Sequence, residues 1–315
     1  MELRQLRYFV RVAELGSIGR AARELNVVAS ALSQQISRLE TELATRLLMR
    51  THTGVVPTAA GAAFLRQAQL TLRHAESAVA AAREARLSGT VSVGFAPATA
   101  YMLARPYYAA MAERHPNVRL HLVEGLSGSL ADQLNARRLD LAVLFQNDAG
   151  NSHNAIPILD ERLFLLARRG LLLARRGLLD LPDGQPVTMA QLALLPLALT
   201  SKAHGMRAWV QAAFERAGRE PWIAVEVDGL TTLMDLVKSN AMATIQPGGT
   251  VARADRELLS AHPIDDPFLF RRSTVRCVNE DELSPAALAA RAVLTDVMRG
   301  LVRQGGWPGA TLLES

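Results

Sequence analysis

The segment from residue 29 to residue 43 is predicted to form a helix whose two faces differ in chemistry. At about 100° per residue, one face carries short hydroxyl and amide groups with an arginine on its flank: Ser30, Ser33, Gln34, Ser37 and Arg38. The opposite face is purely apolar and carries Leu32, Ile36, Leu39 and Leu43. Small uncharged hydrogen-bonding groups suit a helix that enters a DNA groove and reaches base edges. An ordinary solvated surface helix is the alternative, although such faces are usually richer in Glu and Lys.

A second group of candidate DNA contacts follows this helix. Between residues 46 and 58, apolar and polar side chains alternate around Gly54, which predicts a two-stranded wing. Arg50 and His52 are placed to reach phosphates or a minor groove. The predicted wing contacts with DNA are Arg50, Thr51 and Thr53.

Three polar stretches farther along the chain follow predicted strands and open predicted helices. Hydroxyl groups and backbone N–H groups at helix N-termini bind anions, and Lys202 and His204 add positive charge to the third stretch. The candidate ligands of a small carboxylate are Pro97, Thr99, Ala100, Ser127, Ser129, Thr200, Ser201 and His204. Simple helix caps are the alternative for each stretch, but three stretches converging on one cleft favour an effector site.

The sequence offers no residues for catalysis. It contains no G-x-S-x-G elbow, P-loop, G-x-G-x-x-G, H-E-x-x-H or C-x-x-C motif. The seven histidines are scattered without ligand spacing. We therefore predict no enzyme activity, no metal and no cofactor. Cys277 lies in an apolar strand pattern and is predicted to be a buried, unreactive thiol.

Composition restricts the class of protein. With 49% hydrophobic and 21% charged residues in 315, the chain is globular and long enough for a large core. Four arginines interrupt its most apolar stretch, residues 163–181, so no membrane span is expected. No signal peptide opens the sequence, and one cysteine allows no intramolecular disulfide. These features predict a cytoplasmic protein.

The net charge is concentrated at the N-terminus. Residues 1–87 contain twelve arginines and seven acidic residues, whereas residues 88–315 contain equal numbers of basic and acidic residues. A basic segment joined to a neutral body indicates that the first part meets a polyanion and the second part meets something else. Double-stranded DNA is the predicted partner of the basic segment.

The elements that position the candidate DNA contacts are predicted to be helical. Apolar spacing predicts a first helix from about residue 3 to residue 13, and Ser17 is a suitable N-cap for a second. The second and third helices form a helix-turn-helix from Ile18 to Ser37. Thr58 caps a long Ala-rich helix to about residue 87, whose narrow stripe predicts a helix-pairing dimer interface. That stripe consists of Phe64, Ala68, Leu72, Ala75, Val79 and Ala82. A helix folded back on its own core is the alternative.

After Gly89 the pattern changes to alternating strands and helices, which predicts a parallel sheet with helices on both faces in two lobes. Strands are expected at 90–95, 119–125, 139–144, 197–200, 223–227, 242–246 and 269–278. Helices are expected at 102–115, 129–136, 206–217, 230–239 and 284–304, the last capped by Ser284. Residues 165–171 are repeated directly as residues 172–178, either as a lengthened strand end or as an extended loop.

Several of these stretches together resemble the LysR-type transcriptional regulators. The resemblance rests on Leu3-Arg4-Gln5-Leu6-Arg7-Tyr8-Phe9, Gly16-Ser17-Ile18 with Ala21-Ala22, Ala31-Leu32-Ser33-Gln34-Gln35-Ile36 with Leu39-Glu40, Arg50, Pro57-Thr58-Ala59-Ala60-Gly61 and Asp140-Leu141-Ala142-Val143. It covers essentially the whole chain. It implies a winged helix-turn-helix, a dimerising linker helix and a periplasmic-binding-protein-like effector domain.

The predicted division of the chain follows from these elements and this resemblance. The DNA-binding domain spans residues 1–58, the linker helix 59–88 and the effector domain 89–315. Lobe I of the effector domain comprises about 89–162 and 268–304, and lobe II about 163–267. The resemblance also implies a homo-oligomer, usually a tetramer, and it leaves RNA polymerase open as a further partner.

Within the family, the chain is similar to the nitrogen-assimilation-control branch. Its tail, Asp281-Glu282-Leu283-Ser284-Pro285 with Trp307-Pro308-Gly309-Ala310-Thr311, is similar to regulators of tricarballylate utilisation and implies a tricarboxylate effector. The chain departs from the family pattern at Ala241-Met242-Ala243, where Gly-x-Gly is usual, and in the tandem repeat. The alternatives are a solute-binding receptor or a small-molecule enzyme that carries an unrelated N-terminal helical domain.

Overall fold

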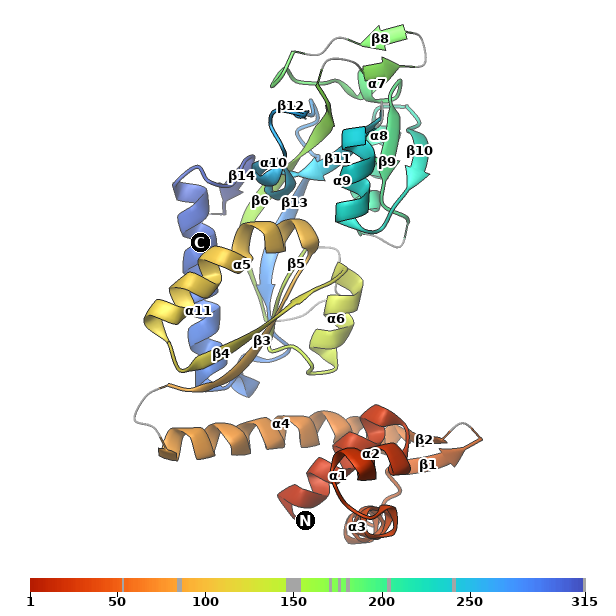
Figure 1. Cartoon of the computed structure of the whole chain (residues 1–315), viewed down its shortest axis with the longest axis vertical. Helices are drawn as coiled ribbons and strands as arrows, with labels where there is room; N and C mark the ends of the chain where they lie inside the picture. The colour runs from red at the N-terminus through yellow and green to blue at the C-terminus, as the bar shows by residue number, and fades with distance from the viewer. Residues whose placement is uncertain are drawn as a thin grey trace. The chain divides into compact units, whose positions relative to one another are not determined.

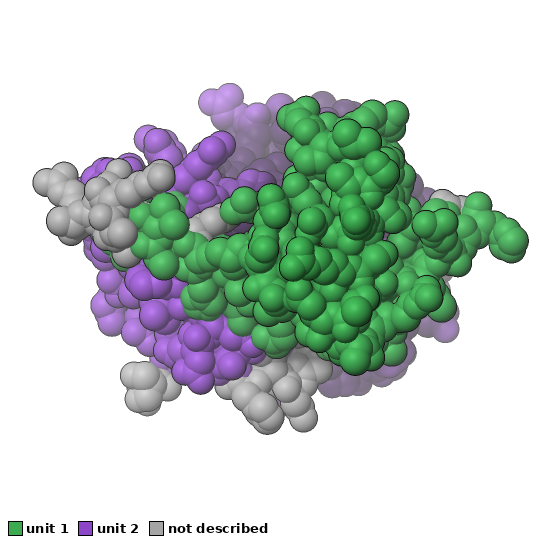
Figure 2. All heavy atoms as spheres, turned by 90° about the horizontal axis from the view of Figure 1, so that it is seen from below, with its two compact units in different colours: residues 1–89 green, residues 90–315 purple. Residues whose placement is uncertain are grey.

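The computed structural model divides into two compact units, residues 1–89 and 90–315, which are considered separately (Figures 1 and 2). It describes residues 1–52, 54–83, 87–145, 154–169, 172–174, 177–179, 182–202, 205–239 and 242–313. None of the described helices combines the length and the apolar composition that a membrane span requires.

The first unit is a three-helix cluster followed by a small β-hairpin and a long helix. Its elements are α1 (Leu3–Leu15), α2 (Ile18–Glu24), α3 (Ala29–Glu42), β1 (Leu48–Thr51), β2 (Gly54–Pro57) and α4 (Ala59–Arg83). Each was predicted from the sequence. The Ser17 side chain accepts a hydrogen bond from the Arg20 N–H, which confirms its predicted role as N-cap of α2.

The apolar face of α3 forms part of the core of this unit. Leu32, Ile36 and Leu39 are buried and belong to one cluster with Phe9. Leu43, predicted on the same face, is the C-cap residue and is 36% exposed, so it is not part of the buried cluster. The buried side of α3 therefore consists of three residues, Leu32, Ile36 and Leu39.

The stripe on α4 has two different environments. Phe64 packs edge to face against Phe9 of α1 at a ring-centroid distance of 5.2 Å, and Ala68 and Leu72 are buried in the same core. This first half therefore folds back on its own unit, so the prediction that the whole stripe pairs with another helix was wrong. Farther along, Val79 is 49% exposed, and the Ala82 side chain lies outside the described residues.

The second unit is a mixed α/β structure in which helices cover both faces of a sheet (Figure 1). Lobe I here contains β3 (Gly89–Phe95), α5 (Pro97–Arg114), β4 (Val118–Glu124), α6 (Ser127–Asn135), β5 (Leu141–Phe145), β13 (Phe270–Arg276), η1 (Glu280–Glu282), α11 (Pro285–Arg303) and β14 (Ala310–Leu312). Lobe II contains α7 (Met189–Leu192), β9 (Pro196–Leu199), α8 (Gly205–Arg216), β10 (Trp222–Glu226), α9 (Leu230–Ser239), β11 (Ala243–Pro247), α10 (Gly248–Arg253) and β12 (Leu259–Pro263). The long strand β6 (Ala155–Arg168) belongs to both lobes.

The strand order is β10-β9-β11-β6-β13-β5-β3-β4, with β12 and β14 also paired to β6. Residues 155–162 of β6 pair with β13, and residues 163–168 pair with β11 and β12. All of these pairings are antiparallel, whereas β3 with β5, and β9 with both β10 and β11, pair in parallel as the βαβ units predicted. The sheet is therefore mixed and not parallel throughout. Sequence periodicity identified the βαβ units, but β6, in which Asp160, Glu161 and Arg162 interrupt the apolar residues, was missed.

The first turns of two helices also differ from the prediction. α5 begins at Pro97, five residues before the predicted start, and α6 begins at Ser127, two residues early. Proline at the first helical position is pre-organised for a helix start because its φ angle is fixed. The stretches predicted as loops are therefore the first turns of these helices. Ser284 accepts a hydrogen bond from the Ala287 N–H and caps α11 as predicted.

The remaining sequence features also have defined places. The first copy of the tandem repeat begins inside β6, and the second contributes to a hairpin of β7 (Leu172–Ala174) and β8 (Gly177–Leu179).

Cys277 is buried as predicted, and burial raises the pKa of its thiol. A raised pKa lowers the fraction of reactive thiolate, which agrees with a structural role for this cysteine.

Candidate functional site

The polar face of α3 is presented to solvent. The Ser30, Gln34 and Ser37 side chains are exposed, and Ser33 is half-buried. Arg38 is also exposed, and its Nε lies 3.6 Å from a carboxylate oxygen of Glu42, one helical turn away. All five predicted residues thus lie opposite the buried side of the helix, where hydroxyl and amide groups can reach a base edge.

The predicted wing residues are also at the surface. Arg50 and Thr51 are exposed on β1, and Thr53 lies outside the described residues. The Thr51 hydroxyl donates to the Gly54 carbonyl oxygen at 3.3 Å, which ties the two ends of the hairpin turn together. The wing therefore holds a cationic side chain near its tip, where a phosphate contact is feasible.

A carboxylate that sequence reasoning did not assign holds the wing beside α3. One oxygen of Glu40 accepts hydrogen bonds from the Leu47 N–H at 2.7 Å and the Leu48 N–H at 2.9 Å. The Thr58 hydroxyl donates to the Arg46 carbonyl oxygen at 2.8 Å and accepts from the Gly61 N–H at 3.0 Å. These bonds fix the start of β1 against the end of α3 and the start of α4.

Gly61 is required by the same junction. A Cβ atom at this position would lie 1.9 Å from the Leu47 carbonyl oxygen, a distance that no side chain can adopt. The sequence Pro57-Thr58-Ala59-Ala60-Gly61 therefore encodes a helix cap and a close approach between α4 and the wing. Its role in the structure is to fix the wing against the start of α4.

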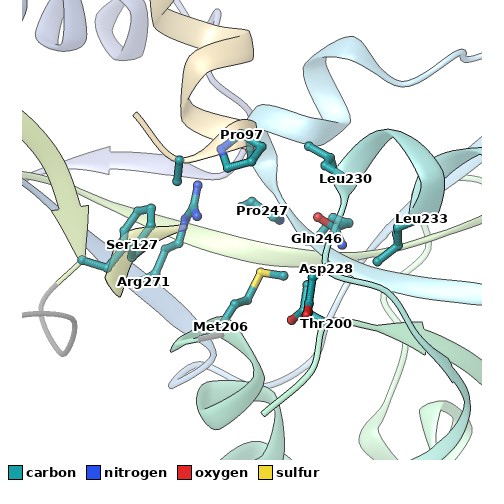
Figure 3. Close-up of a pocket in the computed structure, with 13 residues that line it drawn as sticks. Pro97, Ser127, Thr200, Met206, Asp228, Leu230, Leu233, Gln246, Pro247 and Arg271 are labelled. Atoms are coloured by element: carbon teal, nitrogen blue, oxygen red, sulfur yellow. The ribbon is translucent and has the colours of Figure 1, made fainter. Parts of the chain in front are cut away.

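The candidate effector site is a pocket between the two lobes of the second unit (Figure 3). About 510 Å³ of space lies between its atoms, including the part that opens to solvent. The lining is mostly apolar with a few polar groups, as in many small-molecule sites. The lining residues are Ala96, Pro97, Ala98, Ser127, Phe145, Thr200, Met206, Asp228, Leu230, Leu233, Gln246, Pro247 and Arg271.

The structure brings three of the eight predicted effector residues into this lining: Pro97, Ser127 and Thr200. Thr99 is fully buried behind the lining, Ala100 is half-buried on α5, and Ser129 points to solvent on α6. Ser201 contacts Asp228 instead of lining the pocket. His204 lies outside the described residues, and Lys202 is exposed and does not line the pocket.

The cationic group in the lining is Arg271, which the sequence analysis did not identify. Its side chain is 4% exposed, and its guanidinium lies 4.0 Å from the centre of the Phe145 ring. The Nη2 atom donates to the Thr99 hydroxyl at 3.4 Å. In Figure 3 the guanidinium points into the pocket toward Pro97, at the start of α5. The first N–H groups of a helix and a guanidinium at the same place have the chemistry to bind an anion.

Arg271 is held in place by a fully buried carboxylate. Its Nε donates at 2.7 Å to Oε2 of Glu161, which is 0% exposed. Oε1 of Glu161 accepts from the Trp307 Nε1 and from the Gly249 N–H, each at 2.7 Å. Glu161 lies directly opposite Arg271 in the β6–β13 pairing. Thus one carboxylate joins both long strands, the C-terminal tail and the start of α10.

Gly249 allows the lobes to meet at this point. A Cβ atom there would lie 2.6 Å from the Ala98 carbonyl oxygen, so a larger residue would push α10 away from the first turn of α5. The tail residue Trp307 is buried and reaches Glu161, but it does not line the pocket. Trp307 therefore positions Glu161 and does not contact a ligand in the pocket. A resemblance in sequence alone does not separate these two roles.

Lobe II contributes hydrogen-bond acceptors. Oδ1 of Asp228 accepts from the Ser201 N–H at 2.9 Å, and Oδ2 accepts from the Ser201 hydroxyl at 3.0 Å. The Gln246 Nε2 donates to the Thr244 hydroxyl at 3.1 Å, and its amide oxygen faces the pocket in Figure 3. The pocket thus has a donor-rich side in lobe I and an acceptor-rich side in lobe II.

Some signals for the missed residues were present in the sequence. Arg271, Arg272 and Arg276 lie in the strand predicted at 269–278, and charged side chains in a buried strand need partners. Asp228 and Pro247 directly follow the strands predicted at 223–227 and 242–246, as the predicted site residues follow theirs. Across the residues that the structure describes, no group of three or more His, Cys, Asp or Glu side chains could hold a metal ion.

Two family models match this chain. Residues 3–62 match the bacterial regulatory helix-turn-helix protein model of the lysR family, and residues 84–299 match the LysR substrate binding domain. The chain is 32% identical over 306 residues to the nitrogen assimilation regulatory protein nac of Klebsiella aerogenes, covering 95% of each chain. It is 31% identical to the protein of that name from Escherichia coli strain K12, covering 96% of this chain and 97% of the other.

Solved structures show the same fold. A full-length variant of OxyR from Pseudomonas aeruginosa matches with a TM-score of 0.73 at 23% identity and covers 100% of this chain and 99% of that one. Full-length CbnR in complex with its target DNA matches with a TM-score of 0.62 at 25% identity, covering 95% of this chain and 100% of the other.

The relatives bear on the alternatives. A helix-turn-helix match and an effector-domain match lie on one chain, and relatives that align over nearly their whole length are named as regulators and not as enzymes. An unrelated N-terminal domain on a solute-binding receptor or an enzyme is therefore not supported. This chain belongs to the LysR family of transcriptional regulators, which bind DNA and carry an effector-binding domain.

Proposed function

We propose that this regulator reads a specific DNA sequence with the polar face of α3 and that a small carboxylate in the pocket changes this binding. Ser30, Ser33, Gln34, Ser37 and Arg38 are the proposed major-groove residues, and Arg50, Thr51 and Thr53 are the proposed wing contacts. We also propose that the DNA-binding domain spans residues 1–58, the linker helix 59–88 and the effector domain 89–315. A protein that acts on chromosomal DNA works in the cytoplasm beside RNA polymerase, which we include as a proposed partner.

The proposal of a homo-oligomer rests on the second half of α4. Ala78 and Val79 are exposed there, whereas Ala68 and Leu72 are buried in their own unit. Small side chains allow two helices to approach closely, and a two-fold oligomer places two reading helices on two half-sites. We therefore propose that two chains pair through this half of α4, and that two such dimers form a tetramer.

The observation that carries the effector proposal is the buried Arg271 beside the first turn of α5. A ligand carboxylate there would gain a charged hydrogen bond together with backbone N–H groups and the Ser127 hydroxyl. A tricarboxylate has less support because Asp228 adds negative charge to the lining, and Glu161 already balances Arg271. We therefore narrow the predicted effector to a small compound with one carboxylate at this place.

Two serines on one helix provide the test. Ser127 lines the pocket, whereas Ser129 points to solvent two residues later. Calorimetric titration of the full-length protein with a panel of small carboxylates should identify a ligand. Ser127→Ala should then weaken its binding by about 1–2 kcal/mol, roughly tenfold, and Ser129→Ala should leave it unchanged. Equal affinities for the wild type and Ser127→Ala would place the carboxylate elsewhere.

A further inference from the structure

The two sides of the effector pocket carry opposite hydrogen-bonding chemistry. On the lobe I side lie the Arg271 guanidinium, the first N–H groups of α5 and the Ser127 hydroxyl. On the lobe II side lie the Asp228 carboxylate and the amide oxygen of Gln246. Figure 3 shows Arg271 on one side, Asp228 with Thr200 on the other, and Met206 between them. A ligand that spans the pocket therefore meets donors at one end and acceptors at the other.

We infer that the effector is a zwitterionic amino acid, with its carboxylate at Arg271 and its ammonium group at Asp228. This inference rests on the proposed function, because it assumes that a carboxylate binds beside α5. An ammonium group has three donors and no acceptor, so it matches the Asp228 carboxylate and the Gln246 oxygen. A second carboxylate at the same place would meet Asp228 as a like charge.

The orientation of both key groups is fixed by the protein. Glu161 holds the Arg271 Nε at 2.7 Å, and the Ser201 N–H and hydroxyl hold the two Asp228 oxygens at 2.9 and 3.0 Å. The loop after β9 thereby orients both Asp228 oxygens. The pocket is thus pre-organised for a dipolar ligand, which lowers the entropic cost of binding.

The apolar part of the lining selects the side chain of the ligand. Met206, Leu230 and Leu233 line the pocket on the lobe II side. Apolar side chains of this kind favour a hydrocarbon substituent. The structure therefore assigns the effector to the α-amino acids with an apolar side chain.

The test is calorimetry on the full-length protein with matched ligands. Each standard L-amino acid is titrated, and leucine is compared with 4-methylpentanoate, which lacks the ammonium group, and with leucinamide, which lacks the carboxylate. Other apolar amino acids are compared with their deaminated acids. The inference predicts that at least one apolar amino acid binds ten times more tightly than its deaminated acid and its amide.

Asp228→Asn is the decisive variant because it keeps the size of the side chain. It should weaken amino acid binding at least tenfold and leave the deaminated acid within about threefold of its wild-type affinity. Asp235→Asn, an exposed aspartate on α9 that does not line the pocket, is the matched control and should change neither. Equal losses of both ligand classes in Asp228→Asn would assign Asp228 a structural role and overturn the inference.

The outcomes separate this inference from the proposed function. If deaminated acids or dicarboxylates bind the wild type as tightly as amino acids, and Ser127→Ala still weakens them, the carboxylate site stands and the zwitterion is wrong. If no amino acid and no carboxylate binds at millimolar concentration, both proposals fail.

Discussion

On α3 the polar face is exposed and comes from residues 30–38, whereas the pocket in the other unit is lined by residues as distant in sequence as Ala96 and Arg271. The α3 face consists mainly of uncharged hydroxyl and amide groups. The pocket contains a buried arginine that is balanced by a fully buried glutamate. One surface is thus built from a single helix and the other from the ends of many elements.

This difference has an energetic reason. An exposed helix face can remain hydrated until DNA arrives, and its affinity comes largely from phosphate contacts around it. A buried charge must be paired before the ligand binds, because an unpaired charge in the interior is strongly unfavourable. The network of Glu161, Arg271 and Trp307 supplies that pairing. Substitutions in the buried network of the pocket should therefore lower the stability of the fold, whereas substitutions on the polar face of α3 should lower the affinity for DNA.

The largest expected effect follows from breaking the buried pair. Glu161→Gln should lower the free energy of unfolding of the second unit by about 3–5 kcal/mol, because Arg271 would lose its countercharge. Asp296→Asn is the control: its partner Arg114 is 49% exposed and Asp296 is 60% exposed, so a change below about 1 kcal/mol is expected. Urea unfolding followed by tryptophan fluorescence reports this unit, since Trp209, Trp222 and Trp307 all lie in it. Equal losses in the two variants would contradict the comparison.

The two halves of α4 provide the next test. Leu72→Ala should destabilise the first unit by about 2–5 kcal/mol, since it leaves a cavity in a packed core. Val79→Ala should stay within about 0.5 kcal/mol because the side chain is half exposed. Hydrogen exchange of the α1 amides in the full-length protein measures both. Val79→Glu should instead reduce the mass of the assembly in solution, and an unchanged mass would place the interface elsewhere.

The α3 face and the wing should respond differently to substitution. Gln34→Ala should weaken binding to the specific site by about 1–3 kcal/mol, with little change on unrelated DNA. Arg50→Ala should weaken all sequences alike and lower the salt slope by about one unit, because one phosphate contact is lost. Fluorescence anisotropy over a salt series distinguishes the two. A base-dependent loss in Arg50→Ala would reverse the proposed roles.

The smallest effect concerns a buried histidine in lobe II. Burial lowers the pKa of His262 below its usual value of 6.5, and its Nε2 contacts the Ser260 hydroxyl at 2.9 Å. As the pH falls, His262 therefore takes up a proton in the unfolded chain at a higher pH than in the folded chain. Stability is therefore complete above about pH 6.5 and decreases as the pH falls through the folded pKa. Thermal unfolding at pH 8 and pH 5 should show a smaller difference in His262→Gln than in the wild type.

The first unit could be predicted almost completely because its signals are local. Ser17 and Thr58 cap the helices that they precede, and the spacing of Leu32, Ile36 and Leu39 identified the buried side of α3. The features that could not be predicted were the exposures that depend on tertiary contacts. Leu43 lies where the helix ends, and Leu72 is covered by another helix of the same unit.

In the second unit the rhythm of elements was predictable, but the site was not. Arg271 lies on strand β13 and Asp228 lies on a loop more than forty residues earlier, yet both line the same pocket. The antiparallel pairing of β6 with β13 places Arg271 there. The sequence does not show which residues of two distant strands lie opposite each other, so the pairing of Glu161 with Arg271 could not be predicted. Ser129 and Thr99 illustrate the limit: both occupy the expected segments, yet helical geometry turns them away from the pocket.

The central claim, that α3 reads bases while the wing holds the backbone, is tested most directly by selection from random double-stranded DNA. Full-length wild type, Gln34→Ala and Gln67→Ala are compared, the last being an exposed glutamine on α4. The account predicts that wild type and Gln67→Ala enrich one two-fold symmetric motif, and that Gln34→Ala loses base preference at one position in each half. The same motif with unchanged base frequencies in Gln34→Ala would contradict it.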